Sequence, residues 1–230
     1  MLNFTQFEWL SFDCYGTLID WESGILGYLG PLLRSKGVRV SDDEILNFYS
    51  EAEPREQQQG CRKYREVLAA VVREFGARFG MGVSDKEAAG LAESIRDWQP
   101  FADTATALQA LKQRYKLAVL SNIDDDLFTL TAPTLGVDLD LVVTAQQAGS
   151  YKPSLQNFAT LLQRLPAPKD RLLHVAESLY HDVAPARELG IATVWVNRRQ
   201  SKPAAATKLA AAQADLEVAT VGELAKIAIA

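Results

Sequence analysis

Small polar and charged side chains gather at four points of the sequence, each next to a short apolar segment or a proline. A carboxylate beside a lysine and small hydroxyl groups can attack an electrophile and form an ester, which water then cleaves. These residue types, recurring at successive positions, therefore predict a hydrolase that works through a covalent aspartyl ester. The clustered residues are Asp13 and Thr17, then Ser121 and Asn122, then Tyr151 and Lys152, and finally Glu177, Ser178 and Asp182.

Three charged residues in this set have complementary expected roles. Asp13 is the expected nucleophile, because it follows the first apolar segment directly. Lys152 would keep it ionised, since an opposite charge nearby lowers the pKa of a carboxyl group. Asp182 would position or deprotonate the attacking water. Taken singly, Asp13 could be a helix cap and Lys152 a surface lysine, but four clusters in this order favour one shared site.

Other common kinds of site are missing from the sequence. No glycine-rich nucleotide motif occurs, and no His or Cys pair has the spacing of a zinc site. His174 and His181 are predicted to be structural, and Cys14 to be a packed thiol beside the nucleophile.

The order of apolar segments predicts the elements that hold these residues. Continuous apolar strands alternating with helices are typical of a parallel sheet covered on both faces, where ligands bind beyond the carboxyl ends of the strands. Strands are expected at residues 9–12, 117–120, 141–143, 172–176 and 192–196.

Helical periodicity without strands runs from Ile25 to Trp98, and Pro100 ends it. The predicted fold is an α/β, Rossmann-like, doubly wound and mostly parallel sheet core with an inserted helical cap. The core would comprise residues 1–20 and 99–230, and the cap residues 21–98. A weak exposed helix is expected at residues 203–212.

Composition narrows the classes of partner and compartment. The 230 residues are 48% hydrophobic and 23% charged, with a formal net charge of −5, and no basic stripe is present. Nucleic acid and anionic membrane surfaces are therefore not expected partners. Two cysteines, no basic N-terminal region and no apolar stretch of about 18 residues predict a soluble protein of the reducing cytoplasm.

The four clusters together resemble the motifs of the haloacid dehalogenase-like hydrolase superfamily, and the match covers nearly the whole chain. Together these motifs are highly specific. The resemblance implies that the helical insertion is a cap that closes over the strand ends and excludes water. The matching segments are residues 12–20 (FDCYGTLID), residues 120–122 (LSN), residues 151–153 (YKP) and residues 174–182 (HVAESLYHD).

Tyr15 is the position that separates activities within this superfamily. Its phosphatases place a second aspartate two residues after the nucleophile, as acid and base for the leaving alcohol, whereas this chain resembles the type II L-2-haloacid dehalogenases in having Tyr15. A halide leaving group needs no proton. The resemblance thus implies a 2-haloacid dehalogenase that converts a 2-haloalkanoate into a 2-hydroxyalkanoate and halide, without a cofactor.

The resemblance also implies roles for individual residues. Thr17 and Ser178 would orient Asp13, Ser121 would hold the substrate carboxylate, and Asn122 would contribute to a halide cradle. Tyr15 would line the substrate site. A small anionic substrate and a homodimer are further expectations by analogy.

Three departures leave other functions open. Glu177 stands where a magnesium-binding aspartate would, so Asp13, Glu177 and Asp182 would hold Mg²⁺ in an alternative phosphatase acting on a small metabolite. Phe158 lies near a position where the dehalogenases have a tyrosine. A third alternative is that the chain is a member of the superfamily that binds a ligand and does not catalyse a reaction. No arginine matches the halide-binding cap arginine unambiguously, the candidates being Arg34, Arg39, Arg55, Arg62 and Arg65.

Overall fold

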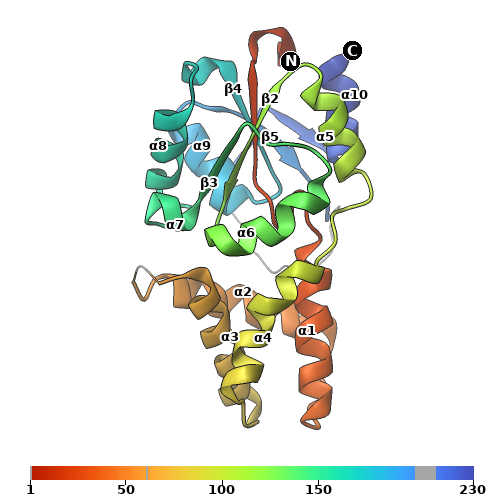
Figure 1. Cartoon of the computed structure of the whole chain (residues 1–230), viewed down its shortest axis with the longest axis vertical. Helices are drawn as coiled ribbons and strands as arrows, with labels where there is room; N and C mark the ends of the chain where they lie inside the picture. The colour runs from red at the N-terminus through yellow and green to blue at the C-terminus, as the bar shows by residue number, and fades with distance from the viewer. Residues whose placement is uncertain (1, 61, 200–210) are drawn as a thin grey trace.

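A six-stranded sheet, parallel throughout, forms the centre of the computed structural model, which describes residues 2–60, 62–199 and 211–230. The strand order is β3-β2-β1-β4-β5-β6, so the chain leaves central β1 first on one side and then on the other (Figure 1). The strands are β1 (Trp9–Phe12), β2 (Lys116–Ser121), β3 (Leu141–Thr144), β4 (Leu172–Ala176), β5 (Ala192–Val196) and β6 (Leu216–Val218).

Helices cover both faces of the sheet because successive strand residues point to opposite sides. Leu117 and Val119 of β2 belong to one apolar core with α5 (Thr104–Lys112) and α10 (Val221–Ile229). Ala118 and Leu120 belong to another with α8 (Leu155–Arg164) and α9 (Ala184–Glu188). The α-helices around the sheet are α5 (Thr104–Lys112), α6 (Asp125–Thr131), α7 (Ala145–Ala148), α8 (Leu155–Arg164), α9 (Ala184–Glu188) and α10 (Val221–Ile229). The shorter helical segments are η1 (Phe4–Gln6), η3 (Ala132–Leu135), η4 (Lys169–Arg171) and the π-helical η5 (Leu179–Val183).

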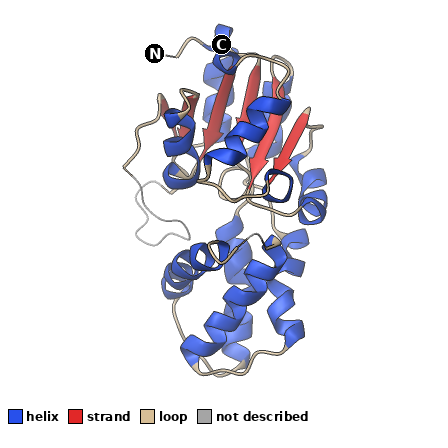
Figure 2. Cartoon of the chain, turned by 90° about the vertical axis from the view of Figure 1, so that its left-hand side faces the viewer, coloured by secondary structure: helices blue, strands red, loops and turns tan. Residues whose placement is uncertain are grey.

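A bundle of helices lies beyond the carboxyl ends of the strands (Figure 2). Apolar residues spaced at helical intervals from Tyr64 to Phe79 form the buried side of one of them, as predicted. The division into a core of residues 1–20 and 99–230 and a cap of residues 21–98 is our interpretation of this arrangement. The bundle consists of α1 (Trp21–Ser35), α2 (Asp42–Gln57), α3 (Tyr64–Phe79), α4 (Asp85–Ser94) and η2 (Ile95–Asp97).

The doubly wound parallel sheet confirms the predicted fold class. β6 was not predicted, because it has only three residues and Glu217 at its centre is exposed. The helix expected at residues 203–212 lies almost wholly outside the described residues. Within the described part of the chain, no helix combines the length and apolar character needed to cross a membrane.

Candidate active site

Asp13 lies at the carboxyl end of the central strand β1, where the chain changes direction across the sheet. The loop that follows folds back on itself, with the Leu18 and Ile19 amides both donating to the Cys14 carbonyl. Gly16 adopts φ +100°, a backbone conformation that favours glycine. This turn brings the Thr17 hydroxyl to 2.8 Å from Asp13 Oδ2, to which it donates a hydrogen bond.

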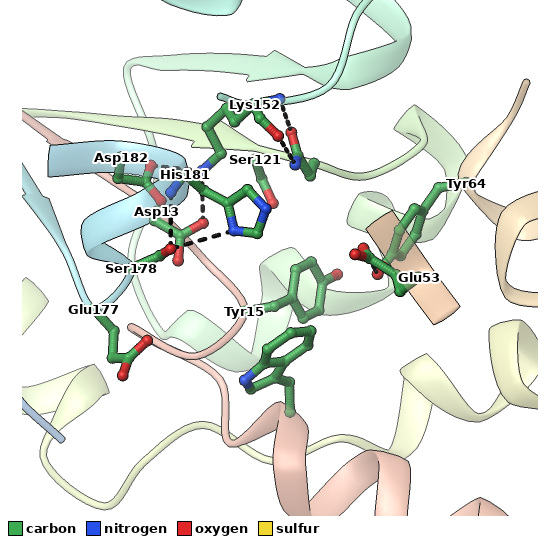
Figure 3. Close-up of a pocket in the computed structure, with 12 residues that line it drawn as sticks. Asp13, Tyr15, Glu53, Tyr64, Ser121, Lys152, Glu177, Ser178, His181 and Asp182 are labelled. Atoms are coloured by element: carbon green, nitrogen blue, oxygen red, sulfur yellow. Dashed lines mark hydrogen bonds and ion pairs between the residues drawn. The ribbon is translucent and has the colours of Figure 1, made fainter. Parts of the chain in front are cut away.

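Lys152 is the centre of the charged cluster (Figure 3). Its ammonium group donates to Asp13 Oδ1 at 2.8 Å, to Asp182 Oδ1 at 2.7 Å and to the Leu120 carbonyl at 2.9 Å. An ammonium group has three donors, so all of them are used within the protein. Only 2% of this side chain is exposed, and the two carboxylates outweigh burial to raise the pKa of Lys152.

The two carboxyl groups that share Lys152 are held in different electrostatic settings. Burial raises the pKa of Asp13, and Lys152 opposes this shift. Burial also acts to raise the pKa of Asp182, but Lys152 and the His174 ring outweigh it, so that pKa lies below its usual range. Lys152 contacts Asp13 as predicted, but it does not lower the pKa of Asp13 below its usual value, because burial outweighs it.

His174 has a partner that the sequence prediction did not give it. Its Nε2 lies 3.0 Å from Asp182 Oδ1, and its Nδ1 lies 2.8 Å from the Ser11 hydroxyl. Both His174 and Ser11 are fully buried and face each other across paired strands β1 and β4. If Ser11 donates to Nδ1, Nε2–H donates to Asp182 and fixes its orientation. His174 is therefore structural, as predicted, but what it supports is the active site.

Two buried polar atoms in this region have no hydrogen-bond partner among the described residues: Ser121 Oγ and Asp182 Oδ2. Both residues line the same cavity as Asp13. Buried polar atoms are normally hydrogen-bonded, because leaving them unpaired costs about 1–3 kcal/mol. Their position predicts that substrate and water supply the missing bonds.

Replacing Ser121 with alanine should weaken substrate binding without changing the stability of the folded protein. Removal of an unpaired buried hydroxyl should leave the free energy of unfolding within about 0.5 kcal/mol of the wild type. Loss of a hydrogen bond to an anionic substrate should raise KM roughly tenfold. Urea unfolding and steady-state kinetics test this, with Ser35→Ala in the helical bundle as control; an unchanged KM would remove Ser121 from the binding site.

Asn122 and Ser178 make different contacts from those expected. Asn122 Oδ1 accepts from the Lys152 amide at 2.7 Å and its Nδ2 donates to the Lys152 carbonyl at 3.0 Å, so the side chain fixes the Lys152 backbone while lining the cavity. Ser178 Oγ accepts from the His181 amide at 2.9 Å. The contacts of Ser178 thus begin the η5 turn that carries Asp182, and Thr17 is the hydroxyl that holds Asp13.

The η5 turn has π-helical geometry, with the Val183 amide donating to the Ser178 carbonyl five residues back. Such turns accommodate one more residue than an α-helical turn and are frequent at functional sites. Asp182 is the fourth residue of this turn and accepts the hydrogen bond from Lys152.

Glu177 lines the cavity, but its carboxyl group points away from the Asp13–Lys152–Asp182 cluster (Figure 3). Within the described residues, no group of three or more His, Cys, Asp or Glu side chains is arranged to hold a metal ion. Asp182 Oδ1 is already occupied by Lys152 and His174. Asp13, Glu177 and Asp182 therefore do not fit the magnesium site considered for the alternative function.

Glu177 should make the free energy of unfolding depend on pH. Burial, followed by the Glu22 carboxylate, raises the pKa of Glu177 from 4.5 to about 8, against the opposing effect of Arg199. Between these values the folded protein keeps a proton that the unfolded chain has lost, so the free energy of unfolding falls as pH rises.

Glu177→Gln should remove this dependence. From pH 5.5 to 8.5, the wild type should lose about 3 kcal/mol more unfolding free energy than the variant. Urea unfolding at the two pH values measures the difference, and exposed Glu188→Gln serves as control. Parallel curves for wild type and Glu177→Gln would contradict the raised pKa.

The surroundings of the Tyr15 hydroxyl make it unsuited to act as an acid or a base. Its hydroxyl lies 2.7 Å from the Thr131 hydroxyl, and its ring packs edge-on against Trp98. Burial raises the pKa of Tyr15 well above its usual value. Tyr15, two positions after Asp13, therefore lines the cavity as a neutral side chain and is a poor proton donor.

The helical bundle contributes an acidic residue, Glu53, to the wall of the cavity. None of the described residues lining the cavity is an arginine, and three of the candidate arginines pair with acids elsewhere: Arg55 with Glu74, Arg62 with Glu56 and Arg65 with Asp126. Glu53 of α2 and Tyr64 of α3 line the cavity instead. The spacing Ile45, Leu46, Tyr49, Ala52 already places residue 53 on the buried side of its helix, a signal that the sequence analysis missed.

The model of the haloacid dehalogenase-like hydrolases matches residues 8–190 of the chain. The chain belongs to this hydrolase family. The match spans the loop of Asp13, the helical bundle, β4 and the η5 turn that carries Asp182.

Relatives of this hydrolase include more than one activity. An (S)-2-haloacid dehalogenase of Pseudomonas fluorescens is 23% identical over 82% of this chain and 83% of its own. The L-2-haloacid dehalogenase of Xanthobacter autotrophicus with chloropropionic acid covalently bound has a TM-score of 0.80 at 19% identity, covering 96% of this chain and 98% of that one. A HAD phosphatase of Thermococcus onnurineus has a TM-score of 0.63 at 26% identity, covering 96% and 97%. The chain shares its fold with both solved structures, so the substrate has to be argued from the site.

Proposed function

We propose that this hydrolase cleaves the carbon–halogen bond of a 2-haloacid through an ester on Asp13. The observation that carries the proposal is Tyr15: the position that would donate a proton to a leaving alcohol holds a buried phenol bonded to Thr131. A halide leaves with its electron pair and needs no proton. The similarity to an (S)-2-haloacid dehalogenase across most of the chain supports the same activity.

The first step would form a bond between a carboxylate oxygen of Asp13 and C2 of the substrate, while the bond from C2 to the halogen breaks. Thr17 and Lys152 hold the carboxylate at 2.8 Å each, which fixes its direction of attack. The Ser121 hydroxyl, buried and unpaired in the protein, would donate to the substrate carboxylate.

The second step would hydrolyse the ester at the carbonyl carbon of Asp13. Water would give a proton to Asp182, whose Oδ2 is buried and has no partner among the described residues. The bond between this carbonyl carbon and the ester oxygen then breaks, and the leaving oxygen takes the proton back from Asp182. The product hydroxyl therefore keeps an oxygen from Asp13, and the second proton of the water leaves the regenerated Asp13 carboxyl group as it ionises. No cofactor is needed for either step.

Halide release from chloroacetate and L-2-chloropropionate tests the proposal. We expect the wild type to release chloride and Asp13→Asn to lose roughly a thousandfold or more of that activity. No release above the Asp13→Asn control would contradict it.

The second candidate, a magnesium-dependent phosphatase, is supported by the position of Glu177 at the cavity and by similarity to a HAD phosphatase. The positions of its three carboxyl groups do not favour it. Hydrolysis of a panel of phosphate monoesters that strictly requires magnesium would decide for the phosphatase. We further propose that the dehalogenase acts on a small anionic substrate, lies in the cytoplasm and forms a homodimer.

A further inference from the structure

Asp124 is a buried acid outside the helical bundle whose carboxylate binds the bundle. It comes three residues after Ser121, at the start of α6, and is only 2% exposed. Its Oδ1 accepts from the Tyr64 amide at 2.8 Å, and its Oδ2 accepts from the Arg65 amide at 3.0 Å. Both oxygens of this carboxylate are therefore bound to the first turn of α3, a helix of the bundle.

α3 begins after a residue that cannot cap it. The other α-helices of the bundle are preceded by a side-chain oxygen that accepts from their own first turn, on Asp20, Ser41 and Ser84. α3 follows Lys63, whose ammonium group has donors only. The first amides of a helix have no partner within the helix, so Asp124 supplies from the sheet the acceptor that Lys63 cannot provide.

A second contact from the sheet reaches the same end of α3. Tyr151 donates its hydroxyl to the Arg62 carbonyl at 2.8 Å, and its ring lies against that of Tyr64, with the centroids 6.1 Å apart. Tyr151 is next to Lys152, and Asp124 belongs to the loop that follows β2. The two loops that carry Ser121 and Lys152 into the site thus both hold the start of α3.

Tyr64, the first residue of α3, connects this contact to the cavity. Its side chain lines the cavity, and Figure 3 shows it across from Asp13 and Lys152. The hydrogen bonds that hold Asp13 and Lys152 come from residues outside the bundle. A movement of the first turn of α3 would therefore open one wall of the cavity and leave its reacting end in place.

We infer that Asp124 is a positioning residue for the substrate site: it docks the start of α3 on the sheet and so keeps Tyr64 in the wall of the cavity. When only docked molecules bind substrate, the apparent affinity falls in proportion to the docked fraction. The effect on kinetics rests on the proposed function, whereas the docking itself does not depend on the reaction.

Distances between spin labels measure the docking without substrate. The labels replace Ala77 of α3 and Gln163 of α8, both exposed, in a chain with Cys61→Ser, and Cys14 is buried. Pulsed electron paramagnetic resonance should give mainly one distance with Asp124 present. In Asp124→Ala a second distance should appear, and the docked fraction should fall at least about threefold, because two hydrogen bonds to a charged group are lost.

Two further variants separate docking from general damage to this loop. Asp125→Ala is the matched control, because Asp125 also begins α6 but its carboxylate accepts from Thr144 and Gln147, outside the bundle. Asp124→Asn keeps one acceptor oxygen and should give an intermediate docked fraction. A single distance in Asp124→Ala and Asp124→Asn, or the same second distance in Asp125→Ala, would overturn the inference.

Steady-state kinetics with L-2-chloropropionate connect the docking to substrate binding. In Asp124→Ala, KM should rise by the factor by which the docked fraction falls, and kcat should stay within about twofold, because saturating substrate draws the bundle back onto the sheet. An unchanged KM, or a fall in kcat alone, would contradict the positioning role. Absence of halide release from the wild type would contradict the dehalogenase proposal, and the label distances would still decide whether Asp124 docks α3.

Discussion

Asp182→Asn should stop the reaction after its first step, so that the substrate stays attached to Asp13 as an ester. Asparagine keeps an oxygen that can accept from Lys152 but cannot take a proton from water. Loss of a general base should slow ester hydrolysis by roughly a hundredfold to ten-thousandfold. With L-2-chloropropionate, one chloride per active site should appear quickly, followed by slow turnover.

Mass spectrometry of the Asp182→Asn protein measures the trapped ester directly. The peptide containing Asp13 should gain the mass of one propanoate unit, and the double variant with Asp13→Asn should gain none. Normal turnover without an adduct, or an adduct in the double variant, would contradict the assignment of Asp182 as the base.

Lys152→Met should produce the largest loss of stability in this site. Lys152 is 2% exposed and lies between two carboxylates, which would be left next to each other without an ammonium group between them. Removing one partner of a buried ion pair costs about 3–5 kcal/mol. The loss should shrink as pH falls, because protonation of the two carboxyl groups removes their repulsion.

Urea unfolding at pH 7.5 and pH 5 measures the effect of Lys152→Met. Lys36→Met is the control, because Lys36 forms a partly exposed ion pair with Glu87, and such pairs contribute little to stability. Equal losses for the two variants, or a Lys152→Met loss that grows at low pH, would show that Lys152 does not hold the two carboxylates together.

Much of the site was predictable because parallel strands bring their carboxyl ends to one edge. Asp13, Ser121 and Asp182 each follow a continuous apolar segment, and this alone placed them together with Lys152. The predicted role of Thr17 beside Asp13 agrees with its 2.8 Å hydrogen bond.

The remaining features depend on side-chain directions that spacing does not determine. Ser178 and Asn122 lie where expected, but their hydrogen bonds go to His181 and to the Lys152 backbone. In the sequence, His174 is simply one residue of an apolar strand. Its contact with the Ser11 hydroxyl depends on the strand register, which places the two residues opposite each other. Glu53 comes from a helix far from every motif, and only the packing of α2 against the site shows that it faces Asp13's cavity.

A single turnover in ¹⁸O-labelled water, with enzyme in excess over L-2-chloropropionate, tests the central claim that Asp13 forms an ester. If water attacks the Asp13 carbonyl, the label enters the Asp13 carboxyl group and the lactate formed in that turnover carries none. Mass spectrometry of the Asp13 peptide and of the product measures both. Labelled lactate with an unlabelled Asp13 would mean that water attacks the substrate directly, and it would contradict the ester mechanism.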